Sequence, residues 1–104
     1  MELTGKAKKE FVQWLSEQGV KGIDISNFEF DKFHLLSKVC QNALIIEWFD
    51  SVGIFVNTVR LEGVWNYSFW FKHNRYEEYN FNTRQKATEQ AIIKANEIYN
   101  ERFK

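Results

Sequence analysis

Few residues of this chain belong to the types that catalyse reactions or bind metals: one cysteine, Cys40, and two histidines, His34 and His73. These three are too few for a closed zinc site, which takes four ligands. A shared metal would also need a carboxylate such as Asp31 or Glu77, brought to both histidines by the fold. Lone histidines in small domains more often make local hydrogen bonds. We therefore predict no metal site and no cofactor.

The sequence also gives little support for a nucleophilic or acid–base site. Cys40 could pair with His34, but it falls in the apolar stripe of a predicted helix, where a cysteine acts as a small hydrophobic residue. Glu77 and Glu78 are neighbours on a predicted strand, so they point to opposite sides and cannot form an acid–base pair. The chain has no glycine-rich phosphate loop and no nucleophile elbow. We predict that the protein is not an enzyme.

Length and composition describe one folded domain over residues 1–104. About a quarter of the residues are charged and 44% are hydrophobic, which is typical of a globular chain. The formal net charge is zero, so no overall field attracts the chain to nucleic acid or to an anionic membrane. A single cysteine, a polar N-terminus and no apolar run of membrane-spanning length predict a cytoplasmic protein without a membrane partner.

Three segments have the spacing of helices. Thr4 is the predicted N-cap of the first, which ends at Gly19. The second covers residues 35–51 and should be the most buried, because its apolar residues extend almost around the helix. The predicted stripe consists of Leu36, Val39, Cys40, Ala43, Ile46 and Phe49, and it is widened by Leu44, Ile45 and Trp48. The last helix is capped by Asn82 or Thr83, and one narrow face holds Ala87, Ala91, Ala95 and Ile98, with Ile92 and Tyr99 beside it.

Two strands, residues 54–61 and a partner that begins at Val64, flank a two-residue turn at Glu62 and Gly63. This turn predicts a hairpin in which the numbers of paired residues sum to 125. One side of the hairpin should pack against the helices; it holds Ile54, Val56, Thr58, Arg60, Trp65, Tyr67, Phe69 and Phe71. The other side should face outward; it holds Phe55, Asn57, Val59, Leu61, Val64, Asn66, Ser68 and Trp70.

A turn through His73, Asn74 and Arg75 leads to a third predicted strand, residues 76–81, with Tyr79 and Phe81 directed inward. The predicted order is therefore α-α-β-β-β-α. We expect an α+β fold in which a three-stranded antiparallel meander has its helices packed on one face.

The outward side of this sheet is the strongest candidate for a binding surface. Phe55, Val59, Leu61, Val64 and Trp70 would form an apolar patch there, which typically marks a site for a protein partner or for self-association. Trp70 and Phe55 would anchor it. The alternative is that residues 19–34 cover this side with Phe28, Phe30 and Phe33, since those apolar side chains must also be buried.

Two resemblances bear on function. The segments LTGKAKKEF, EWFDSVGI and TRQKATEQAIIKANEIYN resemble a family of short proteins carried by gut bacteria and their phages. That family has no known activity, so the resemblance implies only a mobile-element origin, where small proteins often bind a host or phage partner.

The order α-β-β-β-α, with TRQKATEQAIIKA opening the last helix, is similar to the double-stranded-RNA-binding domain. That family grips phosphates with a cluster of lysines at the start of its final helix. Here Arg84 and Gln85 stand at the paired-lysine positions and Thr88 at the next lysine, so two of the three charges are missing. The resemblance implies an alternative function, RNA binding through Lys6, Lys9, Arg84 and Lys86.

Overall fold

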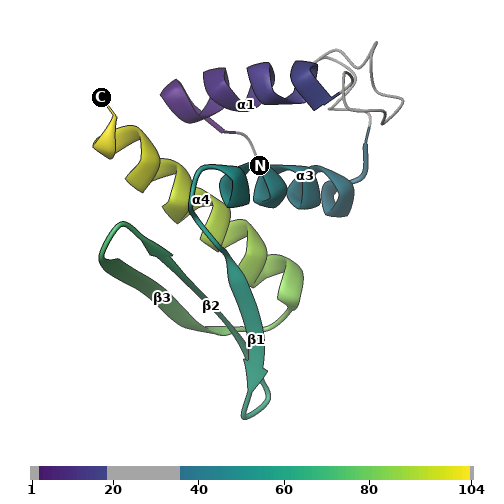
Figure 1. The fold of residues 1–104 in the computed structure, drawn as a ribbon. Coiled ribbons are helices and arrows are strands. Elements are labelled where there is room, and N and C mark those ends of the chain that lie inside the picture. Colours follow the sequence, from purple (N-terminus) through teal and green to yellow (C-terminus); the bar gives the residue numbers. More distant parts are fainter. Residues whose placement is uncertain (1–2, 19–35, 104) are drawn as a thin grey trace.

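A computed structural model describes residues 3–18 and 36–103, and it has the predicted order of elements (Figure 1). The elements are helix α1 (Gly5–Gln18), helix α3 (Lys38–Ser51), strands β1 (Asn57–Leu61), β2 (Val64–Phe71) and β3 (Asn74–Phe81), and helix α4 (Arg84–Arg102). The fold is mixed α+β, as predicted. The predictions for Gly19, for a connection through residues 19–34 and for its cover of the sheet lie outside the described residues.

The first hairpin confirms the predicted register. Leu61 pairs with Val64 and Asn57 with Ser68, so the numbers sum to 125 along the whole ladder. Both turn residues have positive φ, 52° at Glu62 and 83° at Gly63, as a type I′ turn requires. The strand begins three residues later than predicted, at Asn57. Ile54 is nevertheless buried in the core, and its N–H donates to the carbonyl of Phe49 (2.9 Å) at the end of α3.

The prediction that Tyr79 points inward is wrong. The strand β3 begins at Asn74, directly after a two-residue turn, and Tyr76 and Glu78 then occupy the inward positions opposite Phe69 and Tyr67. Two residues of β3, Tyr79 and Asn80, then lie against Asn66 of β2, and Asn80 takes a φ of 75°. Tyr79 is exposed because it alternates with the inward Glu78, and the bulge at Tyr79 and Asn80 then returns Phe81 to the core side.

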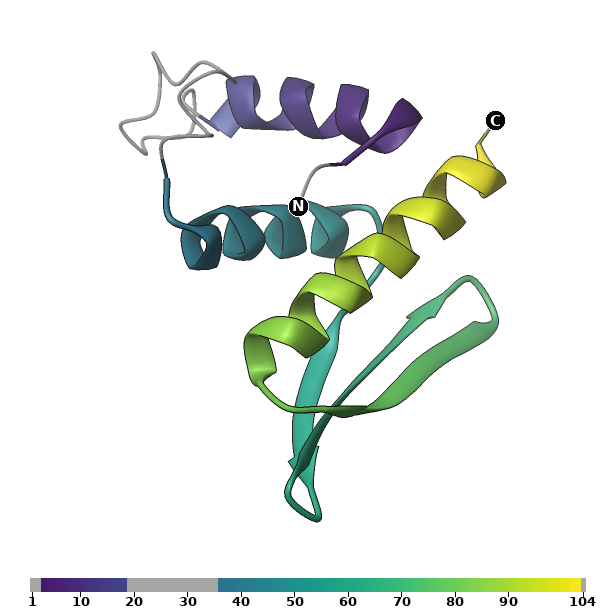
Figure 2. The same ribbon diagram turned by 180° about the vertical axis from the view of Figure 1, so that it is seen from behind.

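The helix α4 lies along the inner face of the sheet and packs against all three strands (Figures 1 and 2). Its three predicted alanines, Ala87, Ala91 and Ala95, are completely buried, as is Ile92, and Tyr99 is almost completely buried. Small side chains at successive turns let the helix axis come close to the strands. The core therefore sits between α4, the inner face of β2, and the two helices α1 and α3.

The helix α3 turns a different face to the core from the one predicted. Ser37 caps its first turn by accepting from the N–H of Cys40, and Ile45, Trp48 and Phe49 are buried together with two polar residues. Val39, Cys40 and Ala43 are exposed instead. The predicted burial of the Cys40 thiol is therefore wrong, and α3 is amphipathic in arrangement rather than buried all round.

The beginning of α1 is held by the last turns of α4. Asn96 exchanges hydrogen bonds with Thr4, accepting from its N–H (3.0 Å) and donating to its hydroxyl (2.9 Å). Asn100 accepts from the N–H of Ala7 (2.8 Å) and donates to the carbonyl of Thr4 (2.8 Å). The predicted N-cap hydroxyl of Thr4 thus faces α4, and Asn100 satisfies the helix amide in its place.

Candidate functional site

The reactive residue types do not gather in the part of the chain that the structure describes. No three histidine, cysteine, aspartate or glutamate residues among residues 3–18 and 36–103 lie close enough to hold a metal ion. Cys40 is exposed on the first turn of α3, and His73 is exposed in the turn between β2 and β3. His34, the proposed partner of Cys40, lies outside the described residues.

The two adjacent glutamates point to opposite sides of β3, as predicted. Glu78 faces inward and accepts a hydrogen bond from the Tyr67 hydroxyl (2.6 Å). Glu77 faces outward, where a hydrogen bond from Tyr79 and the nearby Arg75 guanidinium (2.9 Å) lower the pKa of its carboxyl. Neither arrangement places two carboxyl groups around one point, so no acid–base pair is formed by these residues.

Two buried tyrosines have strongly shifted acidity. Burial raises the pKa of Tyr67 well above its usual value, and the Glu78 carboxylate adds to the shift. Burial raises the pKa of Tyr99 in the same way, with a further contribution from its hydrogen bond to Glu10. A phenol so reluctant to ionise is a poor proton donor near neutral pH. These pairs therefore look structural: one joins β2 to β3 and the other joins α4 to α1.

The shifts predict that the protein loses stability in alkaline solution. Both tyrosines ionise near pH 10 when unfolded but stay protonated in the folded state, so the folded state binds more protons and stability falls as pH rises above 10. Each tyrosine contributes a slope of about 1.4 kcal/mol per pH unit. Urea unfolding across this range measures the slope, and Tyr67→Phe should lower it by the contribution of one tyrosine. If the free energy of unfolding stays constant from pH 10 to about one unit above it, the raised pKa values of the two tyrosines are contradicted.

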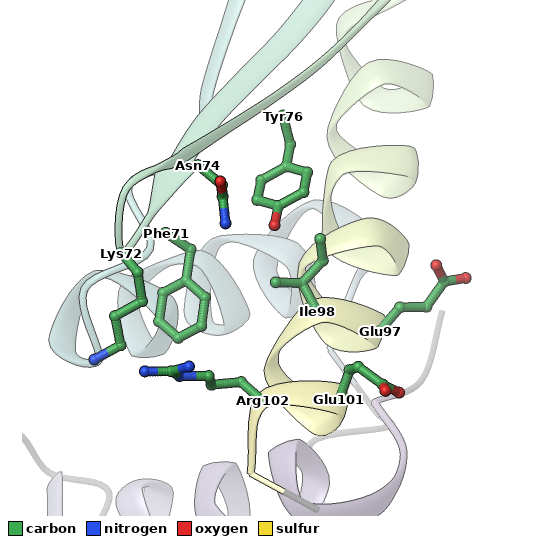
Figure 3. Close-up of a pocket in the computed structure, with 8 residues that line it drawn as sticks. All are labelled: Phe71, Lys72, Asn74, Tyr76, Glu97, Ile98, Glu101 and Arg102. Carbon is green, nitrogen blue, oxygen red and sulfur yellow. The ribbon is translucent and has the colours of Figure 1, made fainter.

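One surface cavity, of about 570 Å³, lies between the β2–β3 turn and the C-terminal turns of α4 (Figure 3). Phe71, Tyr76 and Ile98 form its apolar wall, while Lys72 and Arg102 oppose Glu97 and Glu101 around it. No sequence pattern indicates this cavity, because its lining comes from a turn and a helix end far apart in the chain. Charges of both signs leave no net field to select an anion or a cation.

The outward face of the sheet places the predicted partner-binding residues on one side of the molecule. Val59 and Leu61 of β1 and Trp70 of β2 have exposed fractions of 46%, 54% and 54%, while Val64 is half-buried. Phe55, which precedes β1, is 58% exposed. Among the described helices, α4 covers the opposite face and none covers this one (Figures 1 and 2).

Strand β3 adds a residue to this face that the sequence pattern did not predict. Tyr79 is 53% exposed beside the outward positions of β2, and Arg75 and Glu77 complete the same row of β3. We call the side chains of Phe55, Val59, Leu61, Val64, Trp70 and Tyr79 the outward apolar face. The register places a polar row between two groups of these apolar side chains; the row is Asn57, Ser68 and Glu77. The face thus combines apolar and polar groups, as protein-binding surfaces do.

The residues of the nucleic-acid alternative do not come together. Lys6 and Lys9 lie on the first half of α1, where Lys6 pairs with Glu10 (3.6 Å) and its ammonium is 5.9 Å from the ring centre of Phe103, beyond the end of α4. Arg84 and Lys86 lie on the first turn of α4. This helix has 19 residues, so its first turn is about 28 Å from the end that lies near Lys6. Arg84 also stacks over the ring of Trp65, 4.6 Å from its centre. The four residues therefore form two small basic groups rather than one surface.

The chain was compared with protein-family models, with curated proteins and with solved structures. No family model matches it, and no curated protein or solved structure does either. Separately, none of the described helices is long and apolar enough to cross a membrane. The outward apolar face is the most distinctive surface of the described residues.

Proposed function

We propose that this chain is a non-catalytic protein-interaction module whose binding surface is the outward apolar face. The observation that carries the proposal is the exposure of the face: Phe55, Leu61 and Trp70 each leave more than half of their surface in water. Apolar surface of this extent is costly for a protein that functions alone, and it typically marks an interface.

Trp70 is the proposed anchor of this surface. Tryptophan is enriched among the residues that supply most binding energy, because one rigid side chain removes a large apolar area from water. Its cross-strand neighbour on β3 is Arg75, which is held by Glu77 and so offers a fixed polar rim beside the ring. A partner with an apolar centre and hydrogen-bonding groups at its margin would match this arrangement. The likeness to proteins of phages is compatible with a host or phage protein in that role.

Site-specific photo-crosslinking tests the proposal even though the partner is unidentified. A photoreactive amino acid at position 70 should capture a discrete protein in the native cells, while the same amino acid at the partly exposed Ile93 of α4 should not. The captured protein is then purified and its affinity for the unmodified chain is measured. Capture from both positions, or from neither, would count against the outward apolar face.

With the purified pair, Trp70→Ala should weaken binding by at least about 30-fold, because truncation of an anchoring tryptophan typically costs 2 kcal/mol or more. The melting temperature should change little, since the ring is 54% exposed. Ile93→Ala is the matched control and should leave the affinity unchanged. If Trp70→Ala instead lowers the melting temperature by several degrees at constant affinity, the ring belongs to the core and the proposal fails.

A further inference from the structure

We propose that two copies of this chain pair through the outer edge of β1, forming one continuous six-stranded sheet. This inference goes beyond the proposed function, because it uses backbone groups of β1 and leaves Trp70 free. Within residues 3–18 and 36–103 the strand order is β1-β2-β3, so no described strand pairs with that edge. A strand edge is a row of N–H and C=O groups ready to pair with another chain.

The hairpin turn fixes which backbone groups this edge presents. In a two-residue type I′ hairpin, the residues next to the turn, Leu61 and Val64, exchange hydrogen bonds. Alternation then directs the N–H and C=O groups of Val59 and Asn57 toward β2 as well. The groups of Thr58 and Arg60 point away from the sheet. The free edge therefore presents two donors and two acceptors, all on residues of even number.

The two edges of the sheet are protected very differently. The outer edge of β3 carries three charged side chains, Arg75, Glu77 and Glu78, and the bulge at Tyr79 and Asn80 interrupts it. Charges and bulges are the usual devices that prevent a strand edge from pairing. β1 is regular over all five residues, carries one charge and has neither a proline nor a bulge. This contrast singles out β1 as the edge that accepts a strand.

The sequence of β1 matches a second copy of itself. Antiparallel pairing in which all five residues overlap centres on Val59, so that Val59 lies opposite Val59 of the other copy and Thr58 lies opposite its Arg60. This register pairs even-numbered residues with even-numbered residues, as the outward backbone groups require, and it makes four hydrogen bonds. It also avoids placing Arg60 opposite its own copy. A net charge of zero adds no long-range repulsion between the two chains.

A disulfide at the two-fold axis tests this register directly. Val59 occupies a non-hydrogen-bonded pair, in which Cα atoms are about 4.5 Å apart, within the range that a disulfide spans. Val59→Cys in a Cys40→Ser background should therefore form a covalent dimer with oxidised glutathione. The control is Leu61→Cys in the same background, because its two copies would lie about 13 Å apart along the strands. Equal cross-linking of both variants, or of neither, would overturn the proposal.

Light scattering across a concentration series gives a second measurement on the unmodified chain, which should reach twice its single-chain mass of 12.5 kDa. Arg60→Pro removes an outward N–H without touching the β1–β2 ladder, so it should give a folded monomer at every concentration. Trp70→Ala should remain dimeric. If Trp70→Ala is monomeric and Arg60→Pro is dimeric, the copies meet through the outward apolar face and the edge proposal is wrong. The proposed function is tested separately: Trp70→Ala should lose binding to the captured partner protein while it remains a dimer.

Discussion

Replacing Trp48 with alanine is expected to lower the free energy of unfolding by about 3–5 kcal/mol. The indole is 2% exposed and its ring lies 4.9 Å from Phe49, 5.2 Å from Tyr99 and 6.0 Å from Phe11, measured between ring centres. Trp48 belongs to α3, and its ring contacts α1 through Phe11 and α4 through Tyr99. Its removal leaves a cavity that none of them can fill without moving away from the other two.

Thermal and urea unfolding measure this effect, and Trp70→Ala is the matched control because it removes the same side chain from an exposed position. For a chain of this size the Trp48 variant should melt at least about 12 °C below the unmodified protein. Total stabilities are only about 5–15 kcal/mol, so a partly unfolded variant at room temperature also agrees with the expectation. Equal small losses from both variants would show that Trp48 is not at the centre of the core.

Replacing Asn100 with alanine is expected to cost about 2 kcal/mol and to loosen α1 selectively. The side chain makes hydrogen bonds to Ala7 and Thr4, so its loss leaves the first turn of α1 without its capping acceptor. Gly5 lies against the same amide, and a Cβ at Gly5 would come within 2.9 Å of the Asn100 nitrogen. Hydrogen exchange should show faster exchange of the α1 amides than of those in β2 and α4.

Asn100→Asp separates the two roles of this side chain. The aspartate keeps an acceptor for the Ala7 N–H and places a negative charge at the N-terminus of α1, where the helix dipole favours it. It loses the donor to the Thr4 carbonyl. We expect Asn100→Asp to be more stable than Asn100→Ala. If the two variants lose equal stability, the capping of Ala7 contributes little, and the donor to Thr4 is the important contact.

The parts of the fold that were predictable depend on short-range rules. The turn at Glu62 and Gly63 needs positive φ at both positions, and once it is placed, simple alternation decides the side of every residue on β1 and β2. The buried alanines of α4 were equally predictable, because their spacing marks one face of a helix. The exposure of Trp70, Val59 and Leu61 in the candidate site follows from the same register.

The parts that were not predictable depend on distant contacts or on an ambiguous pattern. Apolar residues surround α3 almost completely, so periodicity could not decide whether Val39 or Trp48 faces the core. The bulge in β3 is centred on an asparagine with positive φ, for which no glycine gives a signal, and it hid the outward position of Tyr79. The cap of α1 by Asn100 joins residues 93 positions apart, beyond the reach of any local rule.

The attachment of Thr4 to Asn96 and Asn100 also has a consequence for how the protein is made. Its hydrogen bonds join residues 92 and 96 positions apart, so α1 cannot complete its docking on α4 until residues 96–100 have left the ribosome. Until then α1, which buries Phe11 and Leu15 in the folded protein, lacks its packing against α4. Apolar residues of α1 thus stay only partly covered until α4 emerges, and a slow stretch of translation before α4 would lengthen the period in which chaperones can bind them.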